Sequence, residues 1–353
     1  MAIIGTGRMA TKHARNFRSC PGVELRACCD VVKEKAESFA KRYRIPKVYT
    51  DWRALLREEE LQAVSIVTPD QTHAPIAIGA ARKGLHVFCE KPLATSVADA
   101  RRMFEAARSA GVVHMVNFSY RDAAALERAA DFIRSGGIGR VRHVEASYLQ
   151  SWLVSRVWGD WRNTPSLTWR LSTAHGSLGV LGDLGCHIFD AASLLAGDFT
   201  ELQVKLATYE KGIPGGRLGP YRLDANDSFV ATVTFESGAI GTIHSTRWAI
   251  GHINSVRLRV YGDRGGLEID LDRGLSRYRL CKGRQAIDRG SWRWVSCAPV
   301  PTCYQRFVRA IKTGRPDPCD FANGLKIQRY MEAAFKSARS GRPVRIRSAP
   351  GAR

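Results

Sequence analysis

The sequence lacks the features that mark several large classes of protein. No stretch approaches the roughly 18 consecutive apolar residues that a membrane-spanning helix needs. The nine cysteines form no CxxC pair and have no histidines at metal-ligand spacing, so we expect neither a disulfide framework nor a metal site. No charged segment precedes the apolar start, as it would in a secretory signal. We therefore expect a cytoplasmic protein with reduced, buried thiols.

Negative charge is also scarce, because 33 acidic residues stand against 54 lysines and arginines, giving a net charge of +21. A charge of this size can indicate a nucleic-acid-binding protein. The arginines are nevertheless spread along the whole chain, and no helix-turn-helix, zinc-finger or RNA-binding signature accompanies them. We predict no nucleic-acid partner and interpret most of this charge as a solvated surface that also attracts an anionic ligand.

The length indicates more than one domain. The chain has 353 residues, and single hydrophobic cores tend to split beyond roughly 250–300 residues. Its 44% hydrophobic and 25% charged residues are typical of globular proteins. We expect a first domain over residues 1–119, a second over 120–340, and a basic tail over 341–353 that frays.

A glycine-rich turn follows the first apolar residues. Ala2-Ile3-Ile4 has the pattern of a short buried strand and leads directly into Gly5-Thr6-Gly7-Arg8-Met9-Ala10, a GxGxxA variant of the dinucleotide fingerprint. In this fingerprint the first glycine permits a tight turn, the second admits a pyrophosphate close to the backbone, and the alanine lets the helix pack near the strand. We predict that the pyrophosphate rests on the N-terminus of the helix that follows.

A carboxylate ends the next predicted strand. Asp30 follows the predicted strand 23–29, where a dinucleotide-binding fold places the acid that accepts hydrogen bonds from the ribose hydroxyls. Such a carboxylate repels a 2′-phosphate and favours NAD over NADP. Two alternatives stay open. Asp30 could cap the helix that begins near Lys33, and Arg8 or Lys33 could accommodate the phosphate of NADP.

Strands and helices continue to alternate up to residue 118. The expected strands are 63–67, 85–89 and 112–118, and the expected helices are 74–83 and 98–110. This alternation predicts a parallel, doubly wound sheet of the Rossmann type, whose ligand crevice lies at the carboxyl ends of the strands. Two motifs follow such strand ends: Thr68-Pro69-Asp70-Gln71-Thr72-His73 and Glu90-Lys91-Pro92.

Beyond Tyr120 the pattern changes. A helix over 123–135, a strand over 141–150 and a tryptophan-rich loop precede a helix from Asp183 to Leu195. Consecutive alternating segments then predict strands at 202–209, 229–235, 239–246, 256–261 and 266–269, with helices at 304–312 and 323–340 closing the chain. We predict an α+β domain with a large, mostly antiparallel open sheet and helices on one face.

The run Gly182-Asp183-Leu184-Gly185-Cys186-His187 carries a carboxylate and an imidazole. Residues four apart on a helix share a face, so Asp183 and His187 would point into one crevice. An imidazole with a pKa near 6.5 suits proton transfer at neutral pH. Each residue also has a purely structural interpretation, Asp183 as a helix N-cap and His187 as a packed ring. Asp190 is expected to be structural.

Together these motifs resemble the glucose-fructose oxidoreductase / inositol dehydrogenase (Gfo/Idh/MocA) family over nearly the full length of the chain. The late turn Gly262-Asp263-Arg264-Gly265-Gly266 also matches that family. Within it, the segments Tyr148-Leu149-Gln150-Ser151-Trp152 and Leu167-Thr168-Trp169-Arg170 look most like levoglucosan-type sugar dehydrogenases. Asp70 departs from the family, because many members carry an asparagine after Thr-Pro.

The resemblance implies an NAD(P)-dependent dehydrogenase that acts on a secondary alcohol of a sugar, anhydrosugar or cyclic polyol. It implies that Lys91 orients the substrate hydroxyl, that His187 is the general acid/base, and that Asp183 assists it. Further residues implied at the cofactor are Gly5, Thr6, Gly7, Arg8, Met9, Asp30, Thr68, Pro69, His73, Glu90 and Lys91. Relatives form dimers or tetramers through the open sheet, so a homo-oligomer is expected.

Three polar residues near predicted strand ends or loops are candidates for binding the substrate: Tyr120, Gln150 and Arg170. They could equally be ordinary polar residues of the sheet or an interface. Two other functions stay open. One is a glycosidase that uses NAD for transient oxidation, and the other is a non-catalytic NAD-binding sensor. The presence of Lys91, Asp183 and His187 together argues against a sensor, which needs no acid-base set.

Overall fold

The computed structural model describes residues 1–346, which form two compact units. The first unit contains Met1–Ser119 and Pro301–Gln328, and the second contains Tyr120–Val300 and the residues from Arg329 onward. Residues 301–328 therefore belong to the first unit, whereas the sequence places them in the second domain. The reason is aromatic packing: Tyr304 and Phe307 of α10 (Cys303–Thr313) lie 5.0 and 6.1 Å from the ring of Phe17.

The first unit is built on a parallel sheet of six strands in the order β3-β2-β1-β4-β5-β6. The strands are β1 Ala2–Ile4, β2 Ala27–Cys29, β3 Lys47–Tyr49, β4 Ala63–Ile66, β5 His86–Cys89 and β6 His114–Val116, and the helices are α1 Arg8–Arg18, α2 Lys33–Tyr43, α3 Trp52–Glu58, α4 His73–Arg82 and α5 Val97–Ser109. The order reverses beside β1, which is the topological switch point where such sheets bind ligands. This is the predicted doubly wound sheet.

The second unit is built on a sheet of nine strands in the order β16-β15-β14-β13-β7-β12-β11-β8-β17. All neighbouring strands are antiparallel except β7 and β12, which run parallel. The strands are β7 Val141–Leu149, β8 Phe199–Ala207, β11 Ser228–Phe235, β12 Ile240–Thr246, β13 Ser255–Gly262, β14 Gly265–Asp270, β15 Arg277–Lys282, β16 Arg293–Ser296 and β17 Val344–Arg345. This mostly antiparallel sheet confirms the predicted fold class.

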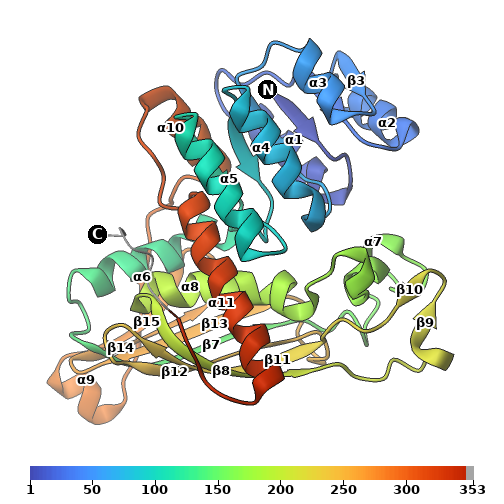
Figure 1. Cartoon of the computed structure of the whole chain (residues 1–353). Coiled ribbons are helices and arrows are strands. Elements are labelled where there is room, and N and C mark those ends of the chain that lie inside the picture. The colour runs from blue at the N-terminus through green and yellow to red at the C-terminus, as the bar shows by residue number, and fades with distance from the viewer. Residues whose placement is uncertain (347–353) are drawn as a thin grey trace. The chain divides into compact units, whose positions relative to one another are not determined.

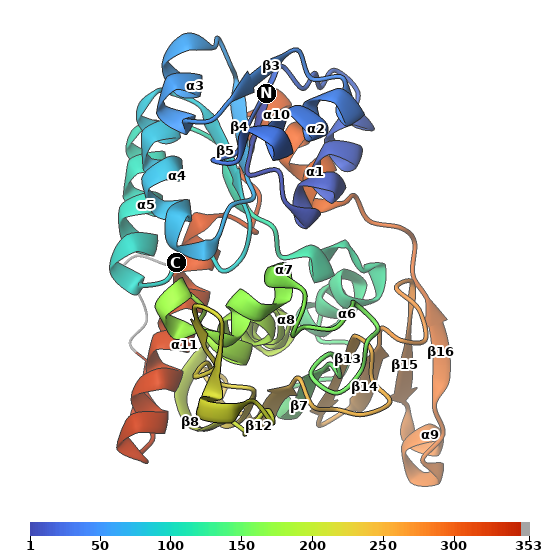
Figure 2. The same cartoon turned by 90° about the vertical axis from the view of Figure 1, so that its right-hand side faces the viewer.

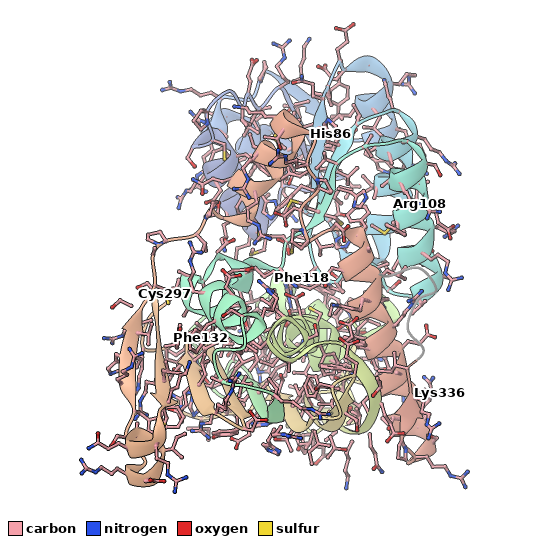
Figure 3. All side chains as sticks on the ribbon, turned by 90° about the vertical axis from the view of Figure 1, so that its left-hand side faces the viewer. His86, Arg108, Phe118, Phe132, Cys297 and Lys336 are labelled. Atoms are coloured by element: carbon pink, nitrogen blue, oxygen red, sulfur yellow. The ribbon has the colours of Figure 1, made fainter. Side chains whose placement is uncertain are left out.

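Helices α6 (Ala124–Arg134) and α8 (Cys186–Ala196) lie over one face of the nine-stranded sheet (Figure 1). The ring of Phe132 of α6, labelled in Figure 3, has its centroid 5.3 Å from Nζ of Lys282 at the end of β15. Phe189 of α8 packs its ring 5.7 Å from Phe199 and 5.5 Å from Phe229. At the edge of the sheet formed by β16, the short helix α9 (Arg284–Arg289) connects β15 and β16 at their tip (Figure 2).

The C-terminal segment differs from the predicted fraying tail. Helix α11 (Phe321–Ser340) is followed by β17, in which Val344 and Arg345 pair with Leu202 and Glu201 of β8. This pairing satisfies backbone groups that an edge strand would otherwise expose to solvent. The rest of the predicted tail, residues 347–353, lies outside the described residues.

All nine cysteines are free thiols, and eight of them are buried. Over residues 1–346, none of the helices combines the length and the apolar character that crossing a membrane requires. Within the same range, no group of three or more His, Cys, Asp or Glu side chains is arranged to hold a metal ion.

Candidate active site

The glycine turn of the first unit leaves its backbone open at the start of α1. Gly5 has φ +92°, and a Cβ at this position would lie 2.5 Å from the carbonyl oxygen of Val67. A Cβ at Gly7 would meet no atom within 4 Å. Gly7 is also the N-cap of α1, and no side chain caps the helix. The first turn of α1 therefore faces open space, which fits the pyrophosphate of a dinucleotide.

Asp30 braces this turn from the end of β2. Its Oδ2 atom accepts hydrogen bonds from the backbone N–H and the hydroxyl of Thr6, both at 2.9 Å. Its Oδ1 atom accepts a hydrogen bond from the N–H of Val32 at 3.0 Å. The N-cap of α2 is Val32, without a side-chain cap, so the alternative that Asp30 caps this helix is wrong. Asp30 instead lies fixed beside the predicted pyrophosphate site.

His73 joins the two motifs that follow β4 and β5. Its ring is buried, with Nδ1 2.9 Å from the carbonyl oxygen of Pro92 and Nε2 3.0 Å from that of Thr68. The peptide bond between Lys91 and Pro92 is cis. His73 thus holds the two loops against each other at the carboxyl edge of the sheet. Its predicted contact with the cofactor stays a prediction.

A buried polar network lies beneath Lys91. Glu90 accepts hydrogen bonds from Nε2 of His13 at 2.8 Å, from the amide of Asn117 at 2.7 Å and from the N–H of Lys91 at 3.2 Å. Burial alone would raise the pKa of Glu90, but the hydrogen bond and charge of His13, the charge of Lys91 and the Asn117 amide lower it to about 2. Nδ1 of His13 lies 2.8 Å from the hydroxyl of Ser65. Glu90 is therefore a carboxylate that anchors the loop carrying Lys91.

In the second unit, the Gly-Asp-Leu-Gly run is helical, as predicted, but it takes the π form and leads without a break into α8. Leu181–Gly185 forms a π-helical turn, η5, and α8 begins at Cys186. A Cβ at Gly182 would lie 2.4 Å from Cβ of Leu178, and one at Gly185 would lie 3.2 Å from the ring of Phe229. The two glycines therefore permit a close approach that a side chain would prevent. Such π-turns occur frequently at functional sites.

Asp183 projects from this turn towards two arginines. Its Oδ2 atom accepts a hydrogen bond from Nη2 of Arg247 at 3.1 Å and lies 3.8 Å from Nε of Arg170. The N-cap of α8 is Gly185, so the interpretation of Asp183 as a helix N-cap is wrong. Sequence reasoning missed Arg247. The available signal was a single arginine directly after the uncharged strand β12.

His187 packs against a hydrogen-bonded group of side chains, Tyr120, Tyr148, Gln150 and Asn254, which we call the tyrosine wall. Its ring is edge-on to those of Tyr120 and Tyr148, with centroids 5.1 and 6.2 Å away. The Tyr120 hydroxyl donates to that of Tyr148 at 2.7 Å, Tyr148 donates to Oδ1 of Asn254 at 2.7 Å, and the Asn254 amide donates back to Tyr120 at 2.8 Å. Burial raises the pKa of Tyr148 well above its ordinary value, and the neighbouring Tyr120 and the Asp183 carboxylate raise it further. These three hydrogen bonds close a ring of Tyr120, Tyr148 and Asn254 beside the imidazole.

Gln150 completes this wall from the end of β7. Its Nε2 atom donates to Asn254 at 2.7 Å and to the hydroxyl of Tyr148 at 3.0 Å, and its Oε1 atom accepts from Nε1 of Trp152 at 3.1 Å. Tyr120 and Gln150 therefore lie in one network next to His187, and Arg170 lies beside Asp183 in the same unit. Their predicted contacts with a substrate stay predictions.

Asp190 has the structural surroundings that the sequence predicted. It forms a buried, two-point pair with Arg121, whose Nε and Nη2 donate at 2.8 and 2.7 Å. This pair links α8 to the turn that precedes α6. The orientation of the helix that carries His187 is thereby fixed.

Comparison with known proteins agrees with these two units. A model described as an oxidoreductase family with an NAD-binding Rossmann fold matches residues 1–118, and the GFO/IDH/MocA C-terminal domain matches residues 126–268. Levoglucosan dehydrogenase of Pseudarthrobacter phenanthrenivorans is 29% identical over 380 residues, covering 96% of this chain and 95% of that protein. D-glucoside 3-dehydrogenase of Escherichia coli is 30% identical over 360 residues, covering 98% and 97%.

The fold is also that of a solved relative. The structure of levoglucosan dehydrogenase in complex with NADH and levoglucosan superposes with a TM-score of 0.87 at 28% identity, covering 98% of this chain and 99% of that chain. The glycine turn, the loop of Lys91 and the turn of Asp183 thus occur in a fold shared over its full length. The chain belongs to the Gfo/Idh/MocA family of NAD-binding oxidoreductases, whose members include sugar and polyol dehydrogenases.

Proposed function

We propose that this enzyme oxidises a secondary alcohol of a sugar, anhydrosugar or cyclic polyol, with His187 as the general acid/base. The observation that supports this most is the position of His187, a residue that is 7% exposed. Its ring packs edge-on against two tyrosines in the unit that also holds the Asp183–Arg247 pair. An imidazole in this position can take a hydroxyl proton and return it.

The cofactor supplies the hydride acceptor when it is bound. The backbone of Gly5, Thr6 and Gly7, with the first residues of α1, would hold its pyrophosphate, and Asp30 would accept hydrogen bonds from its ribose. We propose NAD as the cofactor, because the Asp30 carboxylate is fixed where a 2′-phosphate would be repelled. Arg8 and Lys33 are both exposed, so NADP stays the second candidate.

Lys91 and His187 are proposed to act on the same substrate hydroxyl. The Lys91 ammonium would donate a hydrogen bond to the hydroxyl oxygen and stabilise negative charge that develops on it. His187 would then accept the hydroxyl proton as the carbon is oxidised. Asp183 is proposed to stay a carboxylate throughout, because the guanidinium groups of Arg247 and Arg170 lie against it.

The wall beside His187 suits a ligand with many hydroxyl groups. Tyr120, Gln150 and Arg170 are proposed as its polar contacts, with Gln150 acting partly through the network that it completes. Levoglucosan dehydrogenase and D-glucoside 3-dehydrogenase are named for an anhydrosugar and for glycosides. We therefore place levoglucosan and simple glucosides first among the substrates to be tried.

The test is a panel of sugars, anhydrosugars and polyols with NAD or NADP, followed by the absorbance of the reduced cofactor. His187→Ala and Lys91→Ala are expected to lower kcat at least about 1000-fold, since each removes a group that acts on the transferred proton or the developing charge. NADH binding, measured by fluorescence, should survive both changes. Turnover near the wild-type rate in either variant would refute the assigned role.

The same panel separates the alternatives. An NAD-using glycosidase would release a leaving group from a glycoside without net accumulation of NADH. A sensor would bind NADH and turn over none of the compounds. We also propose a homodimer or homotetramer assembled through the nine-stranded sheet, and the cytoplasmic location stays a prediction.

A further inference from the structure

Arg247 is a fully buried cation that connects three segments of the second unit. Its side chain is 0% exposed. Nη2 donates to Asp183 of the π-turn at 3.1 Å, and Nη1 donates to the carbonyl oxygen of Arg170 at 3.2 Å. The guanidinium carbon also lies 5.0 Å from the ring centroid of Trp152, which follows β7. One side chain thus fixes the turn that carries Asp183.

Arg247 is also the middle member of a row of alternating charges. On one side is Asp227, whose carbonyl oxygen accepts a hydrogen bond from the N–H of Arg247 at 3.0 Å and whose carboxylate pairs at 2.6 Å with the buried amine of Lys211. In front of it lies Asp183, and Arg170 follows on the more exposed side. Burial lowers the pKa of Arg247, whereas the carboxylates of Asp183 and Asp227 act in the opposite direction. The row contains three cations and two carboxylates.

Stability alone does not account for a guanidinium in this place. A buried ion pair usually recovers little more than the cost of its desolvation, and apolar residues of similar volume often serve equally well. Nε of Arg247 is buried and has no hydrogen-bond partner within residues 1–346. A buried polar atom left in this way lowers stability. What an apolar side chain could not replace are the hydrogen bonds to the Asp183 carboxylate and to the carbonyl oxygen of Arg170.

We infer that Arg247 is a positioning residue for the proposed proton transfer: it holds Asp183 as an oriented carboxylate and leaves His187 as the proton acceptor. This inference rests on the proposed function. The charged or titratable groups around the pair include Arg247, Arg170 and Tyr148 at Asp183, and Tyr120 and Tyr148 at His187. Asp227 and Lys211 lie on the Arg247 side.

The test compares Arg247→Met with the wild type. Methionine keeps much of the volume and removes the charge. Loss of a cation raises the proton affinity of every neighbouring group, so the acidic limb of the kcat/KM profile moves to higher pH by about one unit, whether Asp183 or His187 sets it. We expect kcat at neutral pH to fall about 10- to 100-fold through misplacement of Asp183, while the KM for NAD changes less than twofold.

Arg247→Lys separates charge from shape. Lysine keeps a cation but loses the planar fork, so kcat should fall while the acidic limb stays within about 0.3 pH units of wild type. If Arg247→Met does not fold, the kcat and the pH profile of Arg247→Lys alone test the inference. An acidic limb displaced by a full unit in Arg247→Lys would overturn the inference, as would wild-type kcat and an unmoved limb in a folded Arg247→Met.

Arg306→Met is the matched control. Arg306 is a buried arginine of the first unit and forms a two-point pair with Asp317 at 2.8 and 2.6 Å. Its loss should lower the melting temperature without moving the pH profile; an equal shift in this control would also overturn the inference. A wild-type enzyme that oxidises none of the panel compounds refutes the proposed function instead, before any variant is compared.

Discussion

At the scale of single residues, Asp30 connects the glycine turn to the choice of cofactor. Its Oδ2 atom accepts two hydrogen bonds from Thr6, which fixes the carboxylate beside the predicted pyrophosphate site. Hydrogen bonds to a charged group contribute about 1.5–3 kcal/mol, or roughly 10- to 100-fold in binding. Asp30→Ala should therefore lower the ratio of kcat/KM for NAD to that for NADP by about this factor.

Two further variants sharpen that measurement. Thr6→Val removes the hydroxyl but keeps the backbone bond to Asp30, so the ratio should fall only a few-fold. Glu34→Ala removes another exposed carboxylate from the first turn of α2 and should leave the ratio unchanged. A preference for NAD that survives Asp30→Ala unaltered would remove Asp30 from the ribose site.

The residues that the sequence identifies are those whose chemistry follows from a local pattern. Gly5, Gly7 and Asp30 were found from the spacing of one strand-turn-helix unit and the strand after it. Arg247 and Asn254 were missed because their partners Asp183 and Tyr120 are 64 and 134 positions away. No periodicity of a single chain reports contacts of that separation. Only the assembled sheet brings these side chains together.

At the scale of elements, the π-turn shows why the Gly-Asp-Leu-Gly run needs both glycines. A Cβ at Gly182 would lie 2.4 Å from Cβ of Leu178, which cannot move aside by a rotamer change. At Gly185 the nearest atoms are Cδ1 of Leu181 at 3.0 Å and the Phe229 ring at 3.2 Å, both on side chains that can adjust. Crowding of this kind costs typically about 1–3 kcal/mol.

We therefore expect Gly182→Ala to lower the free energy of unfolding more than Gly185→Ala does. The first should cost about 3 kcal/mol and the second about 1 kcal/mol, because alanine also gains helix propensity of under about 1 kcal/mol. Urea unfolding measures both. Gly182→Ala should also lose turnover, since the turn that aims Asp183 must shift. Equal midpoints for the two variants would contradict this account of the turn.

The predicted elements agree with the structure where the apolar pattern is strong. The buried strand predicted at 85–89 is β5 (His86–Cys89), and the alternating strand predicted at 141–150 is β7 (Val141–Leu149). The short strand β3 was missed because none of its three residues is buried. The π-turn was missed because four-residue spacing is compatible with both helix types. The sequence pattern alone does not distinguish them.

At the scale of the whole molecule, the two sheets were predictable and the assignment of residues 301–328 was not. Strands that alternate with helices predict the parallel sheet, whereas strands that follow one another directly predict the mostly antiparallel sheet. The return of α10 to the first unit depends on its aromatic residues meeting Phe17 of α1, nearly the whole chain length away. Amphipathic helices carry no signal of which core they join.

Charge is distributed unevenly over the second unit, which bears on the proposed oligomer. Strands β11 (Ser228–Phe235) and β12 (Ile240–Thr246) lie side by side and contain no Lys, Arg, Asp or Glu, although 25% of the chain is charged. Their outward side chains include Val230, Thr232, Ile240 and Thr242, all exposed. Depletion of charge in the middle of an exposed surface is typical of the core of a protein–protein interface.

A second copy of this chain is the partner that we propose for this face. Thr232 and Thr242 are directly opposite each other on the two strands, so Thr232→Lys with Thr242→Lys would place like charges in the middle of the interface. Sedimentation equilibrium should show an oligomer for the wild type and a monomer for this double variant. Ser38→Lys with Gln62→Lys adds the same charge to exposed positions of the first unit and should leave the assembly intact. A wild type that sediments as a monomer, or a double variant that still assembles, would show that the uncharged strands are not the interface.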